Sequence, residues 1–304
     1  MKRHSFEDYM LAVRSWSFPA SVMPVIVTVC YMFWKQYEIN WLVAVLCLGF
    51  MVLFHAAGNV WDDYFDNKKR GKTEETGVPA LTLAACLILV ATALGILVCA
   101  LAGWQLIWLG LAGLLLALVY PWCKYHVLGE LNVFLTLGVL PVMGTTLAAG
   151  GWFDSQLFFV FESWREAFAV ILQEVLLFAV PLGLITIAII HSDNTRDIAV
   201  DRMAGIHTLP TLVGHKASVV IYICEIIIPY IWIGVLSIIG MLPMFTVFIF
   251  LTMPFACGLC YNMRKSLKLG TRRIKTLDAA TARIQLFFSL ALSLSMIISR
   301  FISL

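Results

Sequence analysis

Two short segments of the chain carry acidic side chains at spacings that could hold a metal ion. The first, residues 55–76, reads HAAGNVWDDYFDNKKRGKTEET. Its candidate ligands are one amide and three carboxylates, Asn59, Asp62, Asp63 and Asp66. At about 100° of rotation per residue, these four side chains fall within a band of roughly 100° on one face of a helix. The segment would therefore present its oxygen atoms together.

The second segment, residues 191–214, reads HSDNTRDIAVDRMAGIHTLPTLVG. Asp193, Asp197 and Asp201 follow one another at intervals of four residues. If the segment is helical, they stack on one face over about 12 Å. Asn194 and Arg196 flank them in the sequence.

Both clusters need a compensating positive charge. Stacked like charges destabilise a helix end, and negative charge at a helix C-terminus is unfavourable. A divalent cation is the simplest partner, because carboxylate oxygens suit Mg²⁺. The alternative is a set of solvated loop charges that pair with nearby Lys and Arg. The recurrence of the pattern in two segments favours Mg²⁺.

Basic residues accompany both acidic segments: Lys68, Lys69, Arg70, Lys72, Arg196 and Arg202. Arginine binds phosphate oxygens through two parallel hydrogen bonds. Carboxylates, Mg²⁺ and basic side chains together describe a site for a diphosphate. The rest of the chain indicates what that diphosphate is attached to.

The composition places the chain in a bilayer. Hydrophobic residues make up 61% of the 304 residues and charged residues only 13%, against about 45–50% and 25% in soluble domains. A soluble protein of this composition would lack the polar groups to cover its surface. Disorder, collagen and a disulfide scaffold are excluded on the same grounds. A diphosphate site in such a chain indicates a lipid diphosphate with an apolar tail.

Nine stretches have the roughly 20 apolar residues that a spanning helix needs. We expect them at about 16–34, 41–60, 79–100, 104–122, 131–150, 171–191, 217–236, 243–262 and 281–302. The uncharged run from Thr76 to Cys123 fits two crossings that break near Gly103, and Gly240–Pro243 separates the seventh span from the eighth. The predicted fold is an all-α integral membrane bundle around an apolar cavity with a polar cytoplasmic mouth, in one domain over residues 1–304.

The basic residues predict the orientation. With a short cytoplasmic lead at residues 1–14, only Lys35, Arg165 and Arg300 of the 21 Lys and Arg lie outside, as the positive-inside rule requires. The C-terminus is then outside, and both Asp-rich segments, described as loops at about 59–76 and 191–214, lie inside. The outer connection at 151–170 is rich in Trp and Phe, which predicts an interfacial helix.

With these motifs in place, the chain resembles the UbiA superfamily of intramembrane prenyltransferases, which have nine helices and Asp-rich motifs after the second and sixth. The motifs that carry the likeness are Asn59-x-x-Asp62-Asp63-x-x-Asp66, Asp193-Asn194-x-Arg196-Asp197-x-x-x-Asp201 and Tyr120-Pro121-x-x-Lys124. Within the superfamily it is most similar to the 1,4-dihydroxy-2-naphthoate polyprenyltransferases of menaquinone biosynthesis. That likeness lies in residues 14–24, Leu128-Gly129-Glu130, Pro141-x-x-Gly144-Thr145 and Asp278-x-x-Thr281-Ala282.

The chain departs from the family pattern at two places. The family often has Asn where Asp62 stands, a change that keeps an oxygen ligand. It also usually has a further Asp near Lys72, where this chain reads Gly71-Lys72-Thr73-Glu74-Glu75 before a short connection to the third span. Glu74 or Glu75 is a candidate replacement for this Asp.

The resemblance implies Mg²⁺-dependent transfer of a polyprenyl group from polyprenyl diphosphate to an aromatic acceptor, dihydroxynaphthoate with loss of CO₂. The implied metal ligands are Asp62, Asp63, Asp66, Asp193, Asp197 and Asp201. The implied catalytic residues are Asp66, Asp193, Asp197, Arg196 and Lys124. The implied substrate-binding residues are Asn59, Asn194, Arg14, Lys68, Tyr120, Tyr125 and Glu130. The implied location is the inner membrane of a bacterium.

Several of these residues have a second interpretation. Tyr120 and Tyr125 could line the aromatic site or anchor the chain at the membrane interface. Arg14 could bind the acceptor's carboxylate or a phosphate, or be a positive-inside anchor. His55 fits a packed histidine better than a cavity residue, and Glu225 is an intramembrane carboxylate, a functional candidate by default, without a role in the family.

Other functions are compatible with nine spans. Other members of the superfamily use 4-hydroxybenzoate, a glyceryl phosphate ether, homogentisate, chlorophyllide or haem as acceptor. A transporter is a further alternative, but transporters place their ion and substrate groups near the bilayer midplane, whereas these acids lie at one mouth. The partners that we expect are the two substrates and the lipid bilayer, and no nucleic acid.

Overall fold

The structure, a computed structural model, describes residues 5–71, 79–151, 173 and 175–302. Within them it is almost entirely helical, and the extended backbone is limited to an isolated bridge between His126 and His207. Nine helices in this part of the chain are long and apolar enough to cross a membrane. The predicted fold class and the predicted number of spans are confirmed. The interfacial helix expected at 151–170 falls at residues 152–170 outside the described part, as do Lys72, Glu74 and Glu75.

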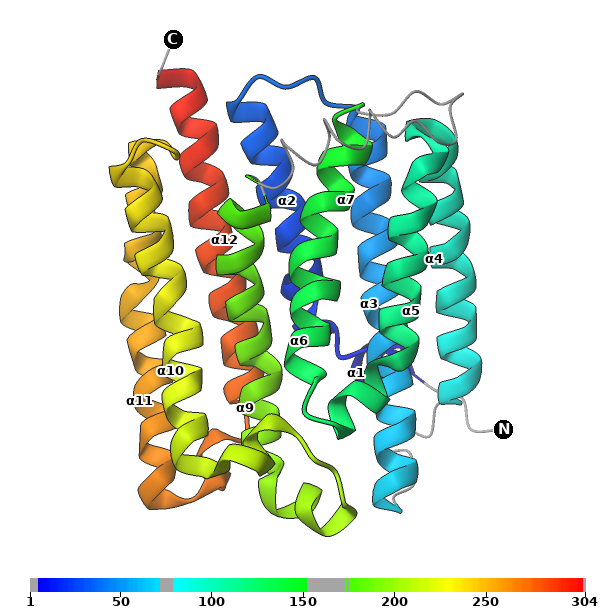
Figure 1. Ribbon diagram of the computed structural model, residues 1–304, viewed down its shortest axis with the longest axis vertical. Helices are drawn as coiled ribbons and strands as arrows, with labels where there is room; N and C mark the ends of the chain where they lie inside the picture. Colours follow the sequence, from blue (N-terminus) through cyan, green and yellow to red (C-terminus); the bar gives the residue numbers. More distant parts are fainter. Residues whose placement is uncertain (1–4, 72–78, 152–172, 174, 303–304) are drawn as a thin grey trace.

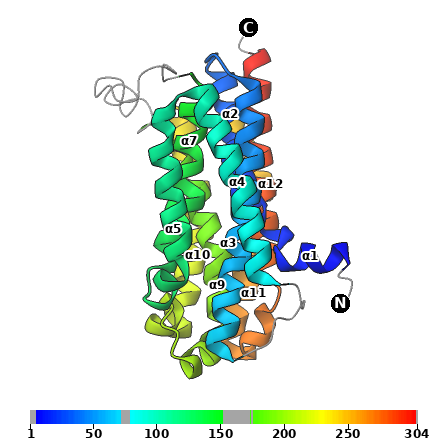
Figure 2. The same cartoon turned by 90° about the vertical axis from the view of Figure 1, so that its right-hand side faces the viewer.

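The helices run up and down along one bundle axis (Figure 1). The nine spans are Ser15–Trp34, Trp41–Arg70, Ala80–Ala102, Trp104–Tyr125, Gly129–Ala149, Val175–Ala204, Leu209–Ile238, Met244–Leu269 and Thr271–Ile302. They contain the helices α2 (Pro19–Trp34), α3 (Trp41–Arg70), α4 (Ala80–Ala102), α5 (Ile107–Tyr125), α6 (Gly129–Val133), α7 (Leu140–Ala149), α9 (Val180–Ala204), α10 (Leu209–Ile238), α11 (Met253–Leu269) and α12 (Leu277–Ile302). Before them, α1 (Phe6–Ala12) projects sideways from the bundle (Figure 2).

Segments of 3₁₀ or π helix complete the spans. The 3₁₀ helices are η1 (Ser15–Ser17), η2 (Trp104–Leu106), η5 (Met244–Thr252) and η6 (Thr271–Ile274), and the π helices are η3 (Phe134–Val139) and η4 (Val175–Ala179). The predicted breaks at Gly103 and at Gly240–Pro243 are present, and both glycines have positive φ. Gly214 interrupts α10 with φ 80°, which leaves a short separate turn before the spanning part. The seventh span therefore begins as a helix earlier than predicted.

The two acidic helices extend beyond their predicted ends at 60 and 191. α3 continues to Arg70 and α9 to Ala204, so the acids lie on helical turns rather than in loops. Each helix ends at a glycine with left-handed φ, Gly71 at 64° and Gly205 at 66°, a conformation that only glycine adopts without strain. Lys68, Lys69 and Arg70 occupy the last turn of α3, where they offset the negative end of the helix dipole.

Close helix packing sets the site's geometry. Gly183 of α9 lies against Phe134, since a Cβ on Gly183 would stand 2.6 Å from the Phe134 ring. Gly138 approaches the same stretch of α9, with its own Cβ position 3.0 Å from the Gly183 Cα. Residues 134–139 form a π-type turn, a feature that often occurs at functional sites. The result is that the middle of the fifth span lies directly against α9.

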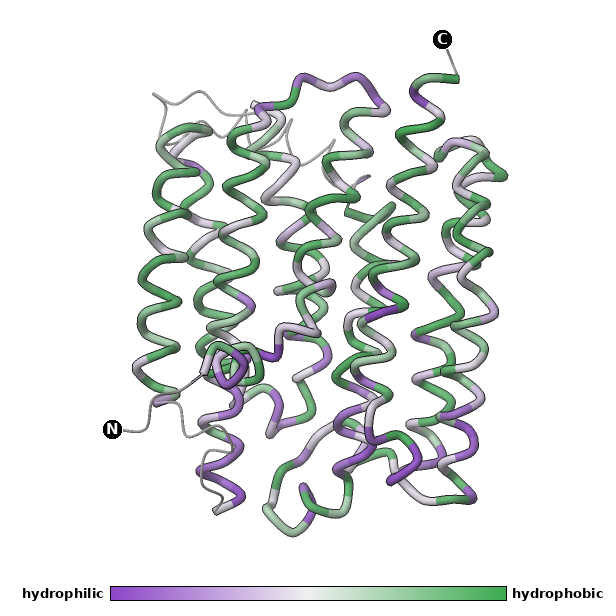
Figure 3. The backbone as a smooth tube through the Cα atoms, turned by 180° about the vertical axis from the view of Figure 1, so that it is seen from behind, coloured by the Kyte–Doolittle hydropathy of each residue, from purple (hydrophilic) through white to green (hydrophobic). Residues whose placement is uncertain are grey.

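Polar residues gather at one end of the bundle, the lower end in Figure 3. The connections at 126–128, 205–208 and 270 lie there, together with the ends of α3 and α9. Deeper in the bundle lies a large apolar cluster of buried side chains that includes Phe178, Tyr222, Tyr230 and Phe288. The fold thus has the predicted polar mouth on an apolar body.

Candidate active site

Lys124 holds the acids of α3 in place. Its side chain is 4% exposed, and its Nζ donates to both oxygens of Asp62 at 3.0 and 3.1 Å and to Oδ2 of Asp66 at 2.7 Å. The Tyr125 hydroxyl donates to the other Asp66 oxygen at 3.1 Å. Because Asp62 and Asp66 are one helical turn apart, the last turn of α5 serves both carboxylates.

Arg70 links the two acidic helices. From the last turn of α3 its guanidinium reaches Asp201 of α9 at 2.7 Å and Asp197 at 3.3 Å, and it lies 3.5 Å from Asp66. Asp201 is fully buried, so this pair is shielded from solvent. Arg70 was one of several basic residues in the first acidic segment. Its contact with the second segment depends on packing that the sequence does not reveal.

Arg196 gathers a third group of acids. It pairs with Asp193 one turn before it, and its Nε donates to Asp197 at 2.9 Å. Its Nη1 lies 3.4 Å from an oxygen of Asp278 at the start of α12. In the sequence Asp278 belongs to a motif of the family likeness, and in the structure it joins the acids at the mouth.

Arg14 lies in the connection between α1 and α2 and lines the mouth. It pairs with Asp63 and has a left-handed backbone at φ 49°. Burial lowers the pKa of its guanidinium, but the carboxylates of Asp63, Asp193, Asp62 and Asp66 outweigh burial and hold the pKa well above its usual value. Arg14 therefore stays charged beside the acids.

The acids and bases surround a wide polar opening of about 780 Å³. Its charged lining residues include Arg14, Asp63, Asp66, Arg70, Asp193, Arg196, Asp197, Lys275 and Asp278. Both acidic segments therefore face one space, from α3 on one side and α9 on the other. Such a space, lined by both signs of charge, can hold a polyanion together with cations.

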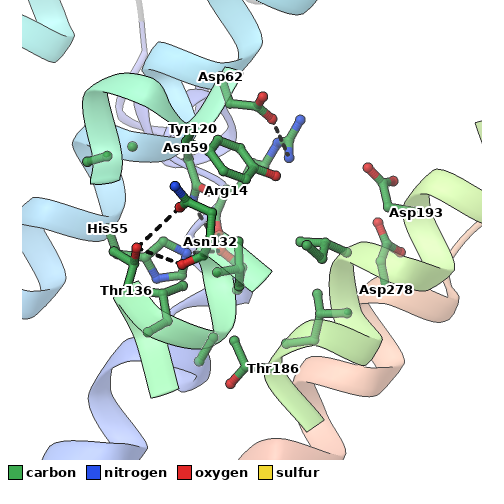
Figure 4. A pocket seen from close by; sticks show the side chains of 18 of the residues that line it. Arg14, His55, Asn59, Asp62, Tyr120, Asn132, Thr136, Thr186, Asp193 and Asp278 are labelled. Atoms are coloured by element: carbon green, nitrogen blue, oxygen red, sulfur yellow. Dashed lines mark hydrogen bonds and ion pairs between the residues drawn. The ribbon is translucent and has the colours of Figure 1, made fainter. Parts of the chain in front are cut away.

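A smaller pocket of about 100 Å³ continues from the mouth into the bundle (Figure 4). Asn59 projects into it and donates to the Val13 carbonyl at 2.9 Å and the Ser17 hydroxyl at 3.1 Å. His55 lies deeper, 2.9 Å from the Ser21 hydroxyl. Tyr120 lies beside Asn59, and Asp193 and Asp278 lie across the pocket from them. The pocket thus combines polar and charged side chains with apolar ones such as Phe54, Val133 and Leu137, a mixture that can orient a small molecule.

Three predicted residues lie elsewhere. Glu130 and Asn194 contact each other at 3.4 Å in a separate buried cluster, where the His191 ring lies 3.8 Å from Glu130 and 3.6 Å from Glu225. Lys68 is exposed in the last turn of α3. None of the three lines the mouth or the pocket. Three more predicted residues, Lys124, Tyr125 and Asp201, line neither space, but each contacts Asp66 or Arg70, which line the mouth. The contact between Glu225 and His191 is invisible in the sequence, because it joins two separate spans.

The carboxylates at the mouth pair with arginine and lysine side chains and do not converge on one position where a metal ion could lie. Across the described part of the chain, no three His, Cys, Asp or Glu side chains are placed to hold a metal ion as they stand. The donor chemistry nevertheless fits Mg²⁺, because Asp63, Asp66, Asp193 and Asp197 offer hard carboxylate oxygens on one opening. The predicted set of metal ligands therefore remains a prediction.

The described part of the chain is a helical membrane bundle with acids and bases around one opening and a pocket that leads into the bundle. The family comparison specifies the class: residues 21–290 match the model of the UbiA prenyltransferase family. The chain belongs to this family, whose members are enzymes that transfer prenyl groups, and the predicted family is confirmed.

Similar proteins agree with this assignment. "UbiA prenyltransferase domain-containing protein 1" of Xenopus tropicalis is 31% identical over 75% of this chain and 66% of its own length. The chain thus spans about two thirds of that relative. "1,4-dihydroxy-2-naphthoate octaprenyltransferase" of Bacillus subtilis is 26% identical, over 95% of this chain and 91% of that protein.

Solved structures share the fold at low sequence identity. A UbiA homologue from Aeropyrum pernix superposes with a TM-score of 0.65 at 19% identity, over 93% of this chain and 98% of that one. A homologue from Archaeoglobus fulgidus, solved with DMAPP and Mg²⁺ bound, has a TM-score of 0.57 at 12% identity. The match covers 93% of this chain and 99% of that one. These likenesses support the fold.

Proposed function

We propose that this prenyltransferase transfers the polyprenyl group of a polyprenyl diphosphate to 1,4-dihydroxy-2-naphthoate, in menaquinone biosynthesis. The observation that carries the proposal is the wide mouth of paired acids and bases that opens into a mostly apolar pocket. The octaprenyltransferase of Bacillus subtilis, which aligns along nearly the whole chain, supports the choice of acceptor. The chain would act as one domain over residues 1–304.

Mg²⁺ fits the donor set at the mouth, and the homologue with bound DMAPP and Mg²⁺ supports its use. Asp63, Asp66, Asp193 and Asp197 would hold it, with Asn59, Asp62 and Asp201 supporting them directly or through water. When bound, Mg²⁺ supplies positive charge that offsets the charge of the diphosphate. The other contributions come from the chain itself.

The basic residues stabilise the leaving diphosphate. As the allylic C–O bond breaks, its electron pair stays on the diphosphate oxygen, and positive charge develops on the prenyl carbon. Arg196, Lys124 and Arg70, already placed among the acids, stabilise the growing negative charge. The apolar walls of the pocket keep water away from the prenyl cation.

The acceptor ring then supplies the electrons. The ring carbon that bears the carboxylate attacks the prenyl carbon and forms the new C–C bond. Loss of CO₂ returns the electron pair of the broken C–C bond to the ring. Arg14, Asn59 and Tyr120 line the pocket where the acceptor would lie, and Arg14 is the candidate partner of its carboxylate.

A product assay in detergent tests the function. The purified protein is offered dihydroxynaphthoate, 4-hydroxybenzoate, homogentisate and a glyceryl phosphate, each with geranyl or geranylgeranyl diphosphate, with and without Mg²⁺. We expect Mg²⁺-dependent prenylated naphthoquinol and released CO₂ by mass spectrometry. Transfer only to another acceptor would overturn the choice of dihydroxynaphthoate. No transfer to any acceptor, with accumulation of the compound inside liposomes, would favour a transporter.

Asp66→Asn provides the matched test of the site. The substitution keeps the shape and removes a charge, so we expect a folded protein that loses transfer. The control is Asn262→Asp on α11, which makes the opposite change away from the mouth. Full activity of Asp66→Asn would remove Asp66 from the set of metal ligands.

We also propose the orientation that the basic residues predict: N-terminus in the cytoplasm, C-terminus outside, in the inner membrane. The polar end in Figure 3 is then the cytoplasmic end. A phosphatase fused to the C-terminus is expected to be active only if that end is outside the cytoplasm. An inactive but expressed fusion would reverse the assignment.

A further inference from the structure

A run of basic side chains lies beside the mouth, at the polar end of α11 and in the connection to α12 (Figure 3). Six of them occur within residues 264–275: Arg264, Lys265, Lys268, Arg272, Arg273 and Lys275. We call these six residues the basic strip. The sequence has no Asp or Glu between Glu225 and Asp278, so the strip has no acidic residue near it along the chain.

The charges of the strip are exposed and are not paired with carboxylates. Five of the six residues are exposed, and Lys265 is half-buried. The ion pairs among the described residues all belong to basic residues outside the strip. The contacts of the strip's side chains are with neutral groups, since Arg273 donates to the Asn262 amide oxygen at 3.0 Å and Lys265 lies 4.6 Å from the centre of the Tyr261 ring.

The helix dipole does not account for so many cations. Lys268 is the basic residue in the last turn of α11, where one positive charge offsets the negative helix end. Exposed apolar side chains occur between the basic ones, with Leu267 and Leu269 exposed to 42% and 63%. Side chains of both kinds lie together at the boundary between lipid acyl chains and headgroups. The strip therefore lies at the level of the lipid headgroups.

The strip is joined directly to the site. Ile274 of η6 is 1% exposed and belongs to the large apolar cluster, so the turn is anchored to the bundle. The next residue, Lys275, accepts a hydrogen bond from Arg196 Nη1 on its backbone carbonyl at 3.2 Å. The same nitrogen lies 3.4 Å from Asp278. A ligand on the strip would thus contact the segment that holds the Arg196 guanidinium.

We propose that the basic strip binds the headgroup of an anionic phospholipid, and that this lipid restrains η6 and thereby Arg196. Charge complementarity favours this partner, because basic clusters beside a spanning helix attract acidic headgroups. Arg264 and Lys268 lie on one face of α11, about 6 Å apart along its axis, so both can contact one phosphate. The effect on Arg196 rests on the proposed prenyl transfer, whereas the binding of the lipid does not.

Native mass spectrometry of the protein in detergent measures the binding. The probes are phosphatidylglycerol and phosphatidylcholine with the same acyl chains. We expect the unmodified protein to bind phosphatidylglycerol about tenfold more tightly, and the double variant Arg264→Gln/Lys268→Gln to lose this preference. The control Lys35→Gln/Arg300→Gln removes the same charge at the opposite end of the bundle (Figure 1) and should keep the preference.

Two results would overturn the lipid site. One is an equal preference for phosphatidylglycerol in the strip variant and the unmodified protein. The other is displacement of phosphatidylglycerol by inorganic diphosphate at the same concentration, because the strip would then be a site for free phosphate groups.

The effect on Arg196 is tested by prenyl transfer in nanodiscs of phosphatidylcholine alone or of equal parts phosphatidylcholine and phosphatidylglycerol. We expect phosphatidylglycerol to raise kcat about fivefold in the unmodified and control proteins, the lower end of coupling between two sites, and not in the strip variant. A more anionic surface by itself would repel the anionic substrates and raise KM in all three proteins. Each protein is compared with itself in the two membranes, so the ratio does not depend on the active fraction.

Equal kcat of the unmodified protein in both membranes would overturn the link between the strip and Arg196. No transfer by the unmodified protein in either membrane would instead overturn the proposed function, and the lipid site would still be decided by the mass spectra.

Discussion

Replacing Lys124 with Met tests whether one buried ammonium group holds the acids of α3. The Lys124 side chain is 4% exposed, and its carboxylate partners Asp62 and Asp66 are 4% and 6% exposed. Methionine keeps most of the volume and removes the charge. The two carboxylates would then be left buried one turn apart without their shared partner.

The expected loss of stability follows from burial. An exposed ion pair contributes at most about 1 kcal/mol, whereas removing one partner of a buried pair costs about 3–5 kcal/mol. Arg70 lies 3.5 Å from Asp66, and Arg14 lies 3.9 Å from Asp62. Because these two cations compensate part of the charge, we expect the lower limit, about 3 kcal/mol in the free energy of unfolding.

The assay is unfolding in mixed micelles, followed by tryptophan fluorescence, on a double-mutant cycle of Lys124→Met and Asp62→Asn. Removing one carboxylate should restore part of the loss, with a coupling energy of about 1–3 kcal/mol. Lys216→Met, at an exposed position of α10, should change stability by less than about 0.5 kcal/mol. A cost of Lys124→Met below about 1 kcal/mol, or strict additivity in the cycle, would refute the reasoning.

Three further predictions concern the mouth and the packing behind it. Arg196→Lys should lower the transfer rate at least tenfold, because one ammonium group cannot replace a planar fork that contacts several carboxylates; an unchanged rate of product formation would remove Arg196 from the site. Chelation of divalent cations should abolish transfer and added Mg²⁺ should restore it, so activity that persists in chelator contradicts a Mg²⁺ site. Gly183→Ala should cost about 1–3 kcal/mol in unfolding free energy, because its Cβ would stand 2.6 Å from the Phe134 ring. The matched Gly258→Ala should be neutral, and equal effects of the two substitutions would show that the contact with Phe134 is unimportant.

The sequence by itself determined the membrane class, the number of spans and the family. Each spanning helix is a local property, since about 20 apolar residues in a row suffice to indicate it. The breaks at Gly103 and Gly240 were equally local. The Asp spacings also placed Asp62 and Asp66 on one helical face, where one lysine serves both. The exact helix ends were less predictable, because α3 and α9 carry their charges on continuous helical turns.

Only the tertiary structure decided which charges meet. Asp62 and Asp63 are neighbours in the sequence, yet about 100° of helical rotation turns one to Lys124 and the other to Arg14. Arg70 pairs with Asp201 across 131 positions of the chain, and no local pattern specifies that pairing. The packing of the helices likewise places Glu130 in a buried cluster with His191 and Asn194, and not at the mouth as predicted.

An apolar cavity lined by α3, α4, α5 and α7 could not be predicted from the sequence for the same reason. A glycine in an apolar span permits either close helix packing or an open space. Gly183 is in close contact with a ring, whereas Gly110 and Gly144 border a void. Local charge patterns in the sequence therefore predicted which side chains are candidates for the site. Which of these side chains meet, and where the helices leave empty space between them, depends on how the helices pack.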